Sequence, residues 1–140
     1  MEIVGIGTDI VECVRIGRMI EEHGEQFFNR VFTPREVRYC QSRKHATEHF
    51  AGRWAAKEAI LKCLGTGWRK GICWTDMEIY NEPDGAPRLF LCGEAGAQAD
   101  RLNITDIHIT ISHCREYATA YALAVAGASP RRLTRVRPEH

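Results

Sequence analysis

The chain has 140 residues, of which 44% are hydrophobic and 26% are charged. This length and composition predict a single globular domain that buries its core without structural metals or disulfides. The formal net charge of +1 is too small to indicate a polyanionic partner for the whole chain. No run of about 18 apolar residues predicts a membrane span.

The cysteines and the N-terminus both bear on the cellular compartment. The six cysteines are spread along the chain without a CxxC pair. Acidic residues, namely Glu2, Asp9 and Glu12, interrupt the N-terminus before the apolar core of a signal peptide could form. We therefore expect a cytoplasmic protein with reduced thiols, most of which act as small core residues.

The first part of the chain predicts one strand and then helices. MEIVGIG indicates a strand that ends in glycines, and Cys13, Ile16 and Ile20 form the inner face of a helix over residues 12–23. A short helical cluster follows at residues 28–32.

Two further helices follow that cluster. TPRE at residues 33–36 combines a threonine N-cap, a proline at the first helical position and the glutamate of a capping box. That helix should end near Ser42. The alanine-rich stretch over residues 48–64 predicts a long helix, which the glycines of residues 65–67 should stop.

Strand patterns dominate the remainder. Residues 75–91 contain two extended runs around the turn signal EPDG, and residues 94–104 predict a short helix. Residues 107–111 and 117–125 alternate with period two, with HCRE as the turn between them. The order β-α-α-α-β-β-α-β-β predicts an α+β fold in which a mainly antiparallel sheet packs on the long helix.

Lys57 is the most unusual residue of the long helix. A helical projection puts it in the expected core stripe with Phe50, Trp54, Leu61 and Leu64. Lysine is almost never fully buried without a partner. Either its stem passes the edge of the core and its charge reaches solvent, or an anionic ligand is the partner.

Two carboxylates could bind a metal. Glu58 and Lys62 form either an i, i+4 helix pair or, together with Lys57, a polyanion site in which Glu58 holds Mg²⁺ against a phosphate group. Mg²⁺ takes one or two protein carboxylates and completes its shell with water and phosphate oxygens. Asp9 is either the N-cap of the following helix or a second ligand of the same metal.

The histidines offer two more possibilities. His113 ends a predicted strand beside a turn, where it is either an isolated turn residue or a ligand contact. His45, Glu48 and His49 match the HxxEH pattern of zinc peptidases, in which two histidines on one helix face bind Zn²⁺. Because nothing downstream marks a third ligand, a zinc hydrolase is only a competing class.

Four segments together resemble one family: GIGTDIVE, FFNRVFTPREV, FAGRWAAKEAILKCLGTG and ISHCREYA. In this order and at this separation they are similar to the small bacterial 4′-phosphopantetheinyl transferases, the holo-[acyl-carrier-protein] synthase type, over about residues 3 to 125. The resemblance implies that the 4′-phosphopantetheine arm of coenzyme A (CoA) is transferred to a serine of apo acyl carrier protein. Adenosine 3′,5′-bisphosphate is the other product.

The resemblance also implies a metal and phosphate site. It makes Asp9 and Glu58 the ligands of Mg²⁺, which would neutralise the pyrophosphate oxygens. Lys62, with help from Lys57, would steady the same oxygens. Without CoA, we expect one of these two lysines to find a carboxylate or a bound anion instead.

Further roles follow from the same resemblance. His113 would form part of the CoA pocket, while Gly65 and Thr66 would let the backbone approach the nucleotide. The general base is open between a metal-ordered water, Glu36 and His113, because that choice depends on geometry.

The family also implies partners. Arg15, Arg18 and Met19 of the first helix would dock the acidic carrier protein. A homotrimer with active sites between subunits is expected, with residues 1–127 as the domain.

Residues 128–140 would form a basic, mobile tail that attracts the carrier, solubilises the chain or binds nucleic acid, although no nucleic-acid partner is expected. A non-catalytic module that binds CoA or a nucleotide is the second competing class.

Overall fold

The computed structural model describes residues 1–68 and 71–127. The elements in chain order are β1 (Glu2–Glu12), α1 (Cys13–His23), α2 (Glu25–Val31), α3 (Pro34–Gln41), α4 (Ala46–Cys63), the 3-10 helix η1 (Trp74–Asp76), β2 (Met77–Asn81), β3 (Pro87–Leu91), α5 (Gly93–Arg101), β4 (Asp106–His113) and β5 (Tyr117–Ala126). The predicted tail at residues 128–140 lies outside the described residues.

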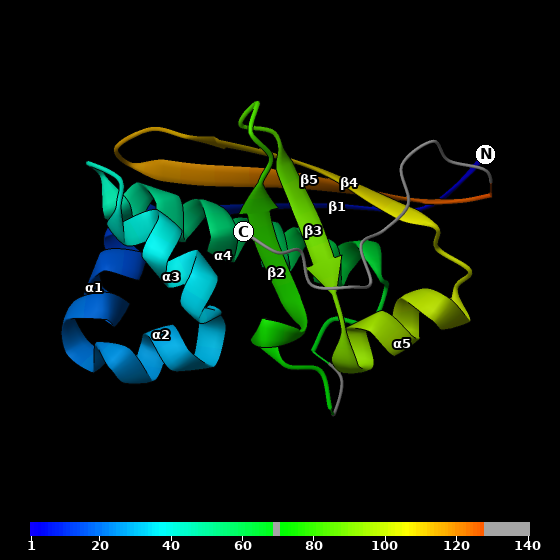
Figure 1. Ribbon diagram of the computed structural model, residues 1–140, viewed down its shortest axis with the longest axis horizontal. Coiled ribbons are helices and arrows are strands. Elements are labelled where there is room, and N and C mark those ends of the chain that lie inside the picture. The colour runs from blue at the N-terminus through cyan, green and yellow to red at the C-terminus, as the bar shows by residue number, and fades with distance from the viewer. Residues whose placement is uncertain (69–70, 128–140) are drawn as a thin grey trace.

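Antiparallel sheets and the long helix α4 form the body of the fold (Figure 1). The larger sheet has the strand order β1-β5-β4, and β2 pairs with β3 in a separate hairpin. Helix α4 contacts all three strands of the larger sheet and also β2. Helices α1, α2 and α3 gather toward one end of α4, and α5 lies toward the other. The predicted α+β architecture is thus confirmed.

Helix α4 is buried on nearly every side, so the single core stripe expected from the sequence is too narrow. Phe50 and Leu61 are buried as expected, but Ala51 and Ala56 on other sides of the helix are buried too. The cause is that the sheet covers one side, while α1, α3 and β2 also pack on the helix. Trp54 is only half-buried.

Strand β5 separates an inner from an outer face of the larger sheet. Its inner positions are all alanines, and they are fully or almost fully buried. Its outer positions include Tyr117 and Tyr121, which are exposed. The small inner side chains let α4 approach the sheet closely; they are Ala118, Ala120, Ala122 and Ala124.

The ends of the elements test the local predictions. The capping box of α3 is confirmed, since the Thr33 side chain accepts from the Glu36 backbone and the Glu36 side chain accepts from the Thr33 backbone. Helix α4 begins at Ala46, two residues before the expected start. Strand β1 continues to Glu12, and within it Asp9 pairs with Ala120. The alternative of Asp9 as a helix N-cap is therefore wrong.

The described residues contain no helix with the length and apolar character needed to cross a membrane. All six cysteines are free. Cys13, Cys40 and Cys63 are buried, but Cys73 and Cys114 are exposed, so the expected core role holds for only part of the set.

Candidate active site

Two glycines bring β1 against α4 and thereby place Asp9. A Cβ atom at Gly5 would lie 2.1 Å from the carbonyl oxygen of Cys63, and one at Gly7 would lie 2.0 Å from that of Ala59. Only glycine fits such backbone contact. Because side chains alternate along a strand, Asp9 is the next inward position, where its Oδ1 lies 3.4 Å from Nζ of Lys62. The packing thus brings the segments GIGTDIVE and FAGRWAAKEAILKCLGTG together.

Glu58 shares this region with Asp9. Partial burial raises the pKa of Glu58, and the charge of Asp9 raises that pKa further. A side-chain hydrogen bond from Trp68 and the charges of Lys62 and Arg15 act in the opposite direction. Two carboxylates that repel each other in a partly desolvated position form a pair that a cation would stabilise.

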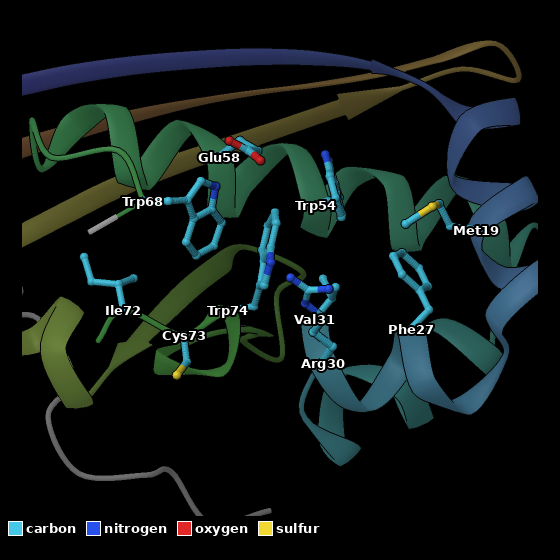
Figure 2. Close-up of a pocket in the computed structure, with 10 residues that line it drawn as sticks. All are labelled: Met19, Phe27, Arg30, Val31, Trp54, Glu58, Trp68, Ile72, Cys73 and Trp74. Atoms are coloured by element: carbon cyan, nitrogen blue, oxygen red, sulfur yellow. The ribbon is translucent and has the colours of Figure 1, made fainter. Parts of the chain in front are cut away.

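A groove of about 610 Å³ opens beside Glu58 (Figure 2). All three tryptophans of the chain line it, and we call it the tryptophan groove. The ring centre of Trp74 lies 4.4 Å from that of Trp54 and 4.3 Å from that of Trp68. The groove is therefore a mainly aromatic channel with a carboxylate at one edge; its other lining residues are Met19, Phe27, Arg30, Val31, Ile72 and Cys73.

Lys57 does not reach this groove. Its side chain is fully buried, and its Nζ lies 2.7 Å from Oε1 of Glu36. Nζ also donates to the carbonyl oxygens of Val31 and Trp74. All three N–H bonds of the ammonium are used, so the expectation that Lys57 binds phosphate or reaches solvent is corrected. The expectation that a lysine finds a carboxylate when no CoA is bound is confirmed here and at Lys62.

Glu36 is equally unsuited to act as the general base. Its side chain is fully buried. Its carboxylate accepts hydrogen bonds from Lys57 and from the backbone nitrogens of Thr33 and Ile79. A carboxylate saturated by buried donors cannot take a proton from a substrate in the groove, because no substrate atom can come within hydrogen-bond distance.

His113 lies far from Glu58 within one chain. It ends β4, and its Nδ1 is 3.1 Å from Oε1 of Glu48 in the first turn of α4. Glu58 follows Glu48 by ten residues, a rise of about 15 Å along an α-helix. The fold of a single chain therefore does not bring His113 to the carboxylate pair.

The zinc-peptidase pattern does not form a metal site. Glu48 contacts His113 and lies 3.8 Å from His45, while the His49 ring packs against the His113 ring at 4.8 Å. Within residues 1–68 and 71–127, no cluster of three or more His, Cys, Asp or Glu side chains could hold a metal ion. The third ligand that a zinc hydrolase needs is thus missing from the described residues.

Comparisons with known proteins agree with this geometry. A family model described as the 4′-phosphopantetheinyl transferase superfamily matches residues 5–126. The chain belongs to this superfamily. The chain is 46% identical to holo-[acyl-carrier-protein] synthase of Rhodopirellula baltica over 123 residues, which cover 88% of this chain and 98% of the relative. It is also 46% identical to that of Koribacter versatilis over 118 residues, with 84% and 94% covered.

Solved structures of the superfamily share the fold. A holo-[acyl-carrier-protein] synthase from Neisseria meningitidis has a TM-score of 0.81 at 30% identity, with 89% of this chain and 99% of that chain covered. The Helicobacter pylori synthase in complex with coenzyme A has a TM-score of 0.76 at 30% identity, with 86% and 99% covered. The family resemblance and the phosphopantetheinyl transferase fold are both confirmed.

The three residues that the family resemblance implies for carrier docking, Arg15, Arg18 and Met19, lie on two different surfaces. Met19 lines the tryptophan groove, and the Arg15 guanidinium lies 5.7 Å from the centre of the Trp54 ring. Arg18 instead lines a separate, mixed-charge pocket together with Lys44 and Arg115. Arg15 and Met19 thus border the groove, and Arg18 extends the surface away from it.

The phosphopantetheinyl transferase motifs also contribute glycine and threonine after α4. Gly65 has φ of +73°, a conformation that favours glycine, and it is exposed. The Thr66 hydroxyl donates to the carbonyl oxygen of Gly67. Both residues follow Lys62 closely in the chain, and their contact with the nucleotide stays a prediction.

Sequence reasoning missed Arg53 as a functional candidate. Arg53 is buried; its Nη2 donates to Oδ1 of Asn81, and its guanidinium lies 4.2 Å from the centre of the Tyr39 ring. No carboxylate among the described residues is within ion-pair distance of it, and its Nε has no hydrogen-bond partner there. It lines a pocket of about 140 Å³ with His49 and His113. The position of Arg53 in the long helix did not indicate a functional role, because the pocket that it lines is formed by segments far apart in the sequence.

Proposed function

We propose that this chain transfers the 4′-phosphopantetheine group of coenzyme A to a serine hydroxyl of apo acyl carrier protein and releases adenosine 3′,5′-bisphosphate. The observation that supports this most directly is the meeting of Asp9, Glu58 and Lys62 beside the tryptophan groove. Oxygen donors and an ammonium at one point suit a pyrophosphate. The relative that was solved with coenzyme A supports the same donor.

Mg²⁺ fits the carboxylate pair. The raised pKa of Glu58 arises from burial and from the charge of Asp9, and a hard divalent cation would remove that repulsion. Mg²⁺ commonly uses only one or two protein carboxylates. When bound, the ion neutralises charge on the phosphate oxygens. Asp9 and Glu58 would hold it, and Lys62, whose side chain is 53% exposed, could turn from Asp9 to a phosphate oxygen.

A homotrimer would complete the site. Large apolar side chains are exposed on the outer face of the larger sheet, among them Ile6, Ile10 and Tyr121. Association of copies through this face would bury them, as expected for an obligate interface. It would also explain how His113, whose partner Glu48 lies about 15 Å along α4 from Glu58, could serve the Glu58 of another copy.

The CoA nucleotide would then use two anion sites. Lys62, Gly65 and Thr66 belong to the pyrophosphate side. Arg53, with His113 beside it, would bind a second phosphate in the small pocket of a neighbouring copy. A buried guanidinium without a carboxylate partner gains most from a ligand anion. His113 also stays a candidate general base in that assembly, whereas Glu36 does not.

The carrier protein would approach over α1. Arg15 and Met19 place the docking surface at the edge of the tryptophan groove, and Arg18 extends it. Positive charge at such a rim steers an acidic partner. The free thiols suit the reducing cytoplasm in which we propose that the reaction takes place.

The deciding experiment is transfer followed by mass spectrometry. The chain is mixed with CoA, Mg²⁺ and apo acyl carrier protein, and the carrier is weighed. We expect a gain of one phosphopantetheine that disappears with EDTA and with Glu58→Ala. No gain with a folded chain and a competent carrier would leave a CoA-binding module as the better description. Zinc that copurifies and is needed for hydrolysis would instead support the other competing class.

A further inference from the structure

A buried ion pair connects the segments that form the tryptophan groove. Nζ of Lys57 lies 2.7 Å from Oε1 of Glu36, and neither side chain is accessible to solvent. The same Nζ donates to the carbonyl oxygens of Val31 at 2.7 Å and of Trp74 at 3.3 Å. One ammonium on α4 therefore binds the end of α2, helix α3 and the 3-10 helix η1.

Glu36 extends the same centre to two more backbone groups. Its Oε1 accepts from the nitrogen of Thr33, and its Oε2 accepts from the nitrogen of Ile79, each at 2.9 Å. The junction between α2 and α3 and the middle of β2 are thus held by the carboxylate that pairs with Lys57. All of these bonds except the one to Trp74 are buried, where hydrogen bonds to charged groups are strong and geometrically demanding.

Two of the bound carbonyls belong to groove residues. Val31 and Trp74 face α4 across the tryptophan groove, and Trp54 and Glu58 project from α4 on the other side (Figure 2). Lys57 immediately precedes Glu58 in the chain. The pair therefore fixes the segment opposite α4 at a set distance from the carboxylate that we assign to the reaction.

We infer that Lys57 and Glu36 are positioning residues: the pair sets the width of the tryptophan groove relative to Glu58, and neither side chain touches substrate. This inference rests on the proposed function for its kinetic consequence. A displacement of about 1 Å in a substrate-positioning group can cost on the order of 10²-fold in rate. A pair that merely stabilised the fold would affect activity only through the amount of folded protein.

A matched pair of variants separates the two roles. Glu36→Gln removes one buried negative charge at the groove, and Asp106→Asn removes one at the start of β4. Asp106 is also buried, accepts from the nitrogen of Ile107 and lies 3.9 Å from the guanidinium of Arg88. It does not line the groove. Both variants should lose stability, but only Glu36→Gln should change the groove.

The tryptophans provide a readout that does not depend on catalysis. Since all three line the groove, the emission of the whole protein reports on it. We expect Glu36→Gln to shift the emission maximum and increase acrylamide quenching, with Asp106→Asn unchanged. At a temperature where both variants are fully folded, Glu36→Gln should lower kcat/KM for CoA by roughly tenfold. This is less than the loss on the order of 10²-fold for a displacement of about 1 Å.

A second variant tests the pair as a unit. Lys57→Met alone leaves a buried carboxylate without its partner, whereas Lys57→Met with Glu36→Gln removes both charges and keeps an amide oxygen that can accept from a backbone nitrogen of Thr33 or Ile79. We expect the double variant to be more stable than Lys57→Met but to keep the changed emission and low kcat/KM. Wild-type emission and kcat/KM in Glu36→Gln or in the double variant would overturn the inference. If wild type transfers nothing, the proposed function fails and the emission alone decides the positioning role.

Discussion

The Nζ of Lys62 lies 3.4 Å from Oδ1 of Asp9 and 2.7 Å from the carbonyl oxygen of Thr8. This contact joins the last turn of α4 to the middle of β1. Because the lysine is half exposed and its ion pair is long, the pair contributes little to stability. The geometry is therefore consistent with our proposal that Lys62 exchanges Asp9 for a phosphate oxygen without disturbing the fold.

Lys62→Met should accordingly leave stability almost unchanged and impair substrate use. We expect the free energy of unfolding to change by no more than about 0.5 kcal/mol, as for other surface substitutions, while kcat/KM for CoA falls. Urea unfolding and initial rates check this. The buried Lys57 is the contrast, because Lys57→Met should cost about 3–5 kcal/mol by leaving an uncompensated charge. A large loss of stability in Lys62→Met would contradict the assignment.

Gly7→Ala should push β1 away from α4. The added Cβ would meet the carbonyl oxygen of Ala59 at 2.0 Å, and backbone atoms cannot turn aside as side chains do. Overpacking of this kind costs about 1–3 kcal/mol, and the shift would also displace Asp9. Urea unfolding measures the first effect, and Mg²⁺ titration of the transfer rate measures the second.

Gly17→Ala is the matched control for that substitution. Gly17 lies inside α1, and a Cβ there would meet Thr47 at an ordinary 3.6 Å. Alanine is favoured over glycine in a helix by about 1 kcal/mol, so this variant should be as stable as wild type or more so. Equal losses of stability in both variants would show that the backbone contact at Gly7 is not the cause.

Glu58→Gln should stabilise the metal-free protein at neutral pH. The pKa of Glu58 is raised above its ordinary 4.5 by burial and by Asp9. Stability from a raised pKa is fully present below the unfolded value and is lost as the pH rises through the folded value. Glu58→Gln should therefore be more stable than wild type at pH values above the raised pKa of Glu58. The two proteins should be equally stable below about pH 4.5, where the glutamate is neutral. Melting temperatures across the pH range measure it.

Mg²⁺ supplies the complementary test of Glu58. The ion should raise the melting temperature of wild type, because a ligand that binds the folded state stabilises it. It should do so much less in Glu58→Gln, and that variant should not transfer phosphopantetheine. An equal Mg²⁺ effect in both proteins would place the metal elsewhere.

Complementation tests the active site between copies. His113→Ala and Glu58→Ala should each be inactive alone. If each site takes His113 from one copy and Glu58 from another, coexpressed trimers should recover activity at about a quarter of their sites, from random mixing within a closed ring. The readout is transfer by copurified, differently tagged variants. No recovery in verified mixed trimers would mean that both residues act from the same chain or that one does not act.

Arg18→Glu should weaken carrier binding and leave CoA binding unchanged. Arg18 is exposed and lies away from the tryptophan groove, so the substitution changes the encounter with an acidic partner rather than the reacting centre. We expect KM for the carrier to rise by roughly tenfold at low salt and the difference to shrink as salt screens the charges. An unchanged KM for the carrier would remove Arg18 from the docking surface.

The features that the sequence predicts well are those with local causes. The capping box at Thr33 and Glu36 depends on residues three positions apart, and it forms as expected. The position of Asp9 is harder to predict from the sequence, because its place in β1 depends on pairing with Ala120 far along the chain. Its strand is also held by a hydrogen bond from the Thr119 hydroxyl to the carbonyl oxygen of Asp9.

Lys57 is the clearest example of a residue whose partner cannot be predicted from the neighbouring sequence. Its helical position correctly marked it as a lysine in the core that needs a partner. The partner, Glu36, is 21 residues away and belongs to another helix. No periodicity within α4 identifies it. The tryptophan groove escaped prediction for the same reason, since Trp54, Trp68 and Trp74 share no spacing and meet only after the chain folds.

The layer between β5 and α4 has an evolutionary consequence. Its inner side chains are alanines on the strand, and glycines occupy the neighbouring β1 positions, Gly5 and Gly7. Glycine and alanine are the two smallest residues, so truncation, the usual way in which mutation weakens a core, can remove at most one methyl group at each position. Enlargement is the main direction left, and at Gly5 and Gly7 backbone contact blocks it. Mutational drift in this layer is thus limited mainly by the size of the side chain that is introduced, and the same limit protects the distance between Asp9 and Glu58, the two carboxylates that we propose bind Mg²⁺.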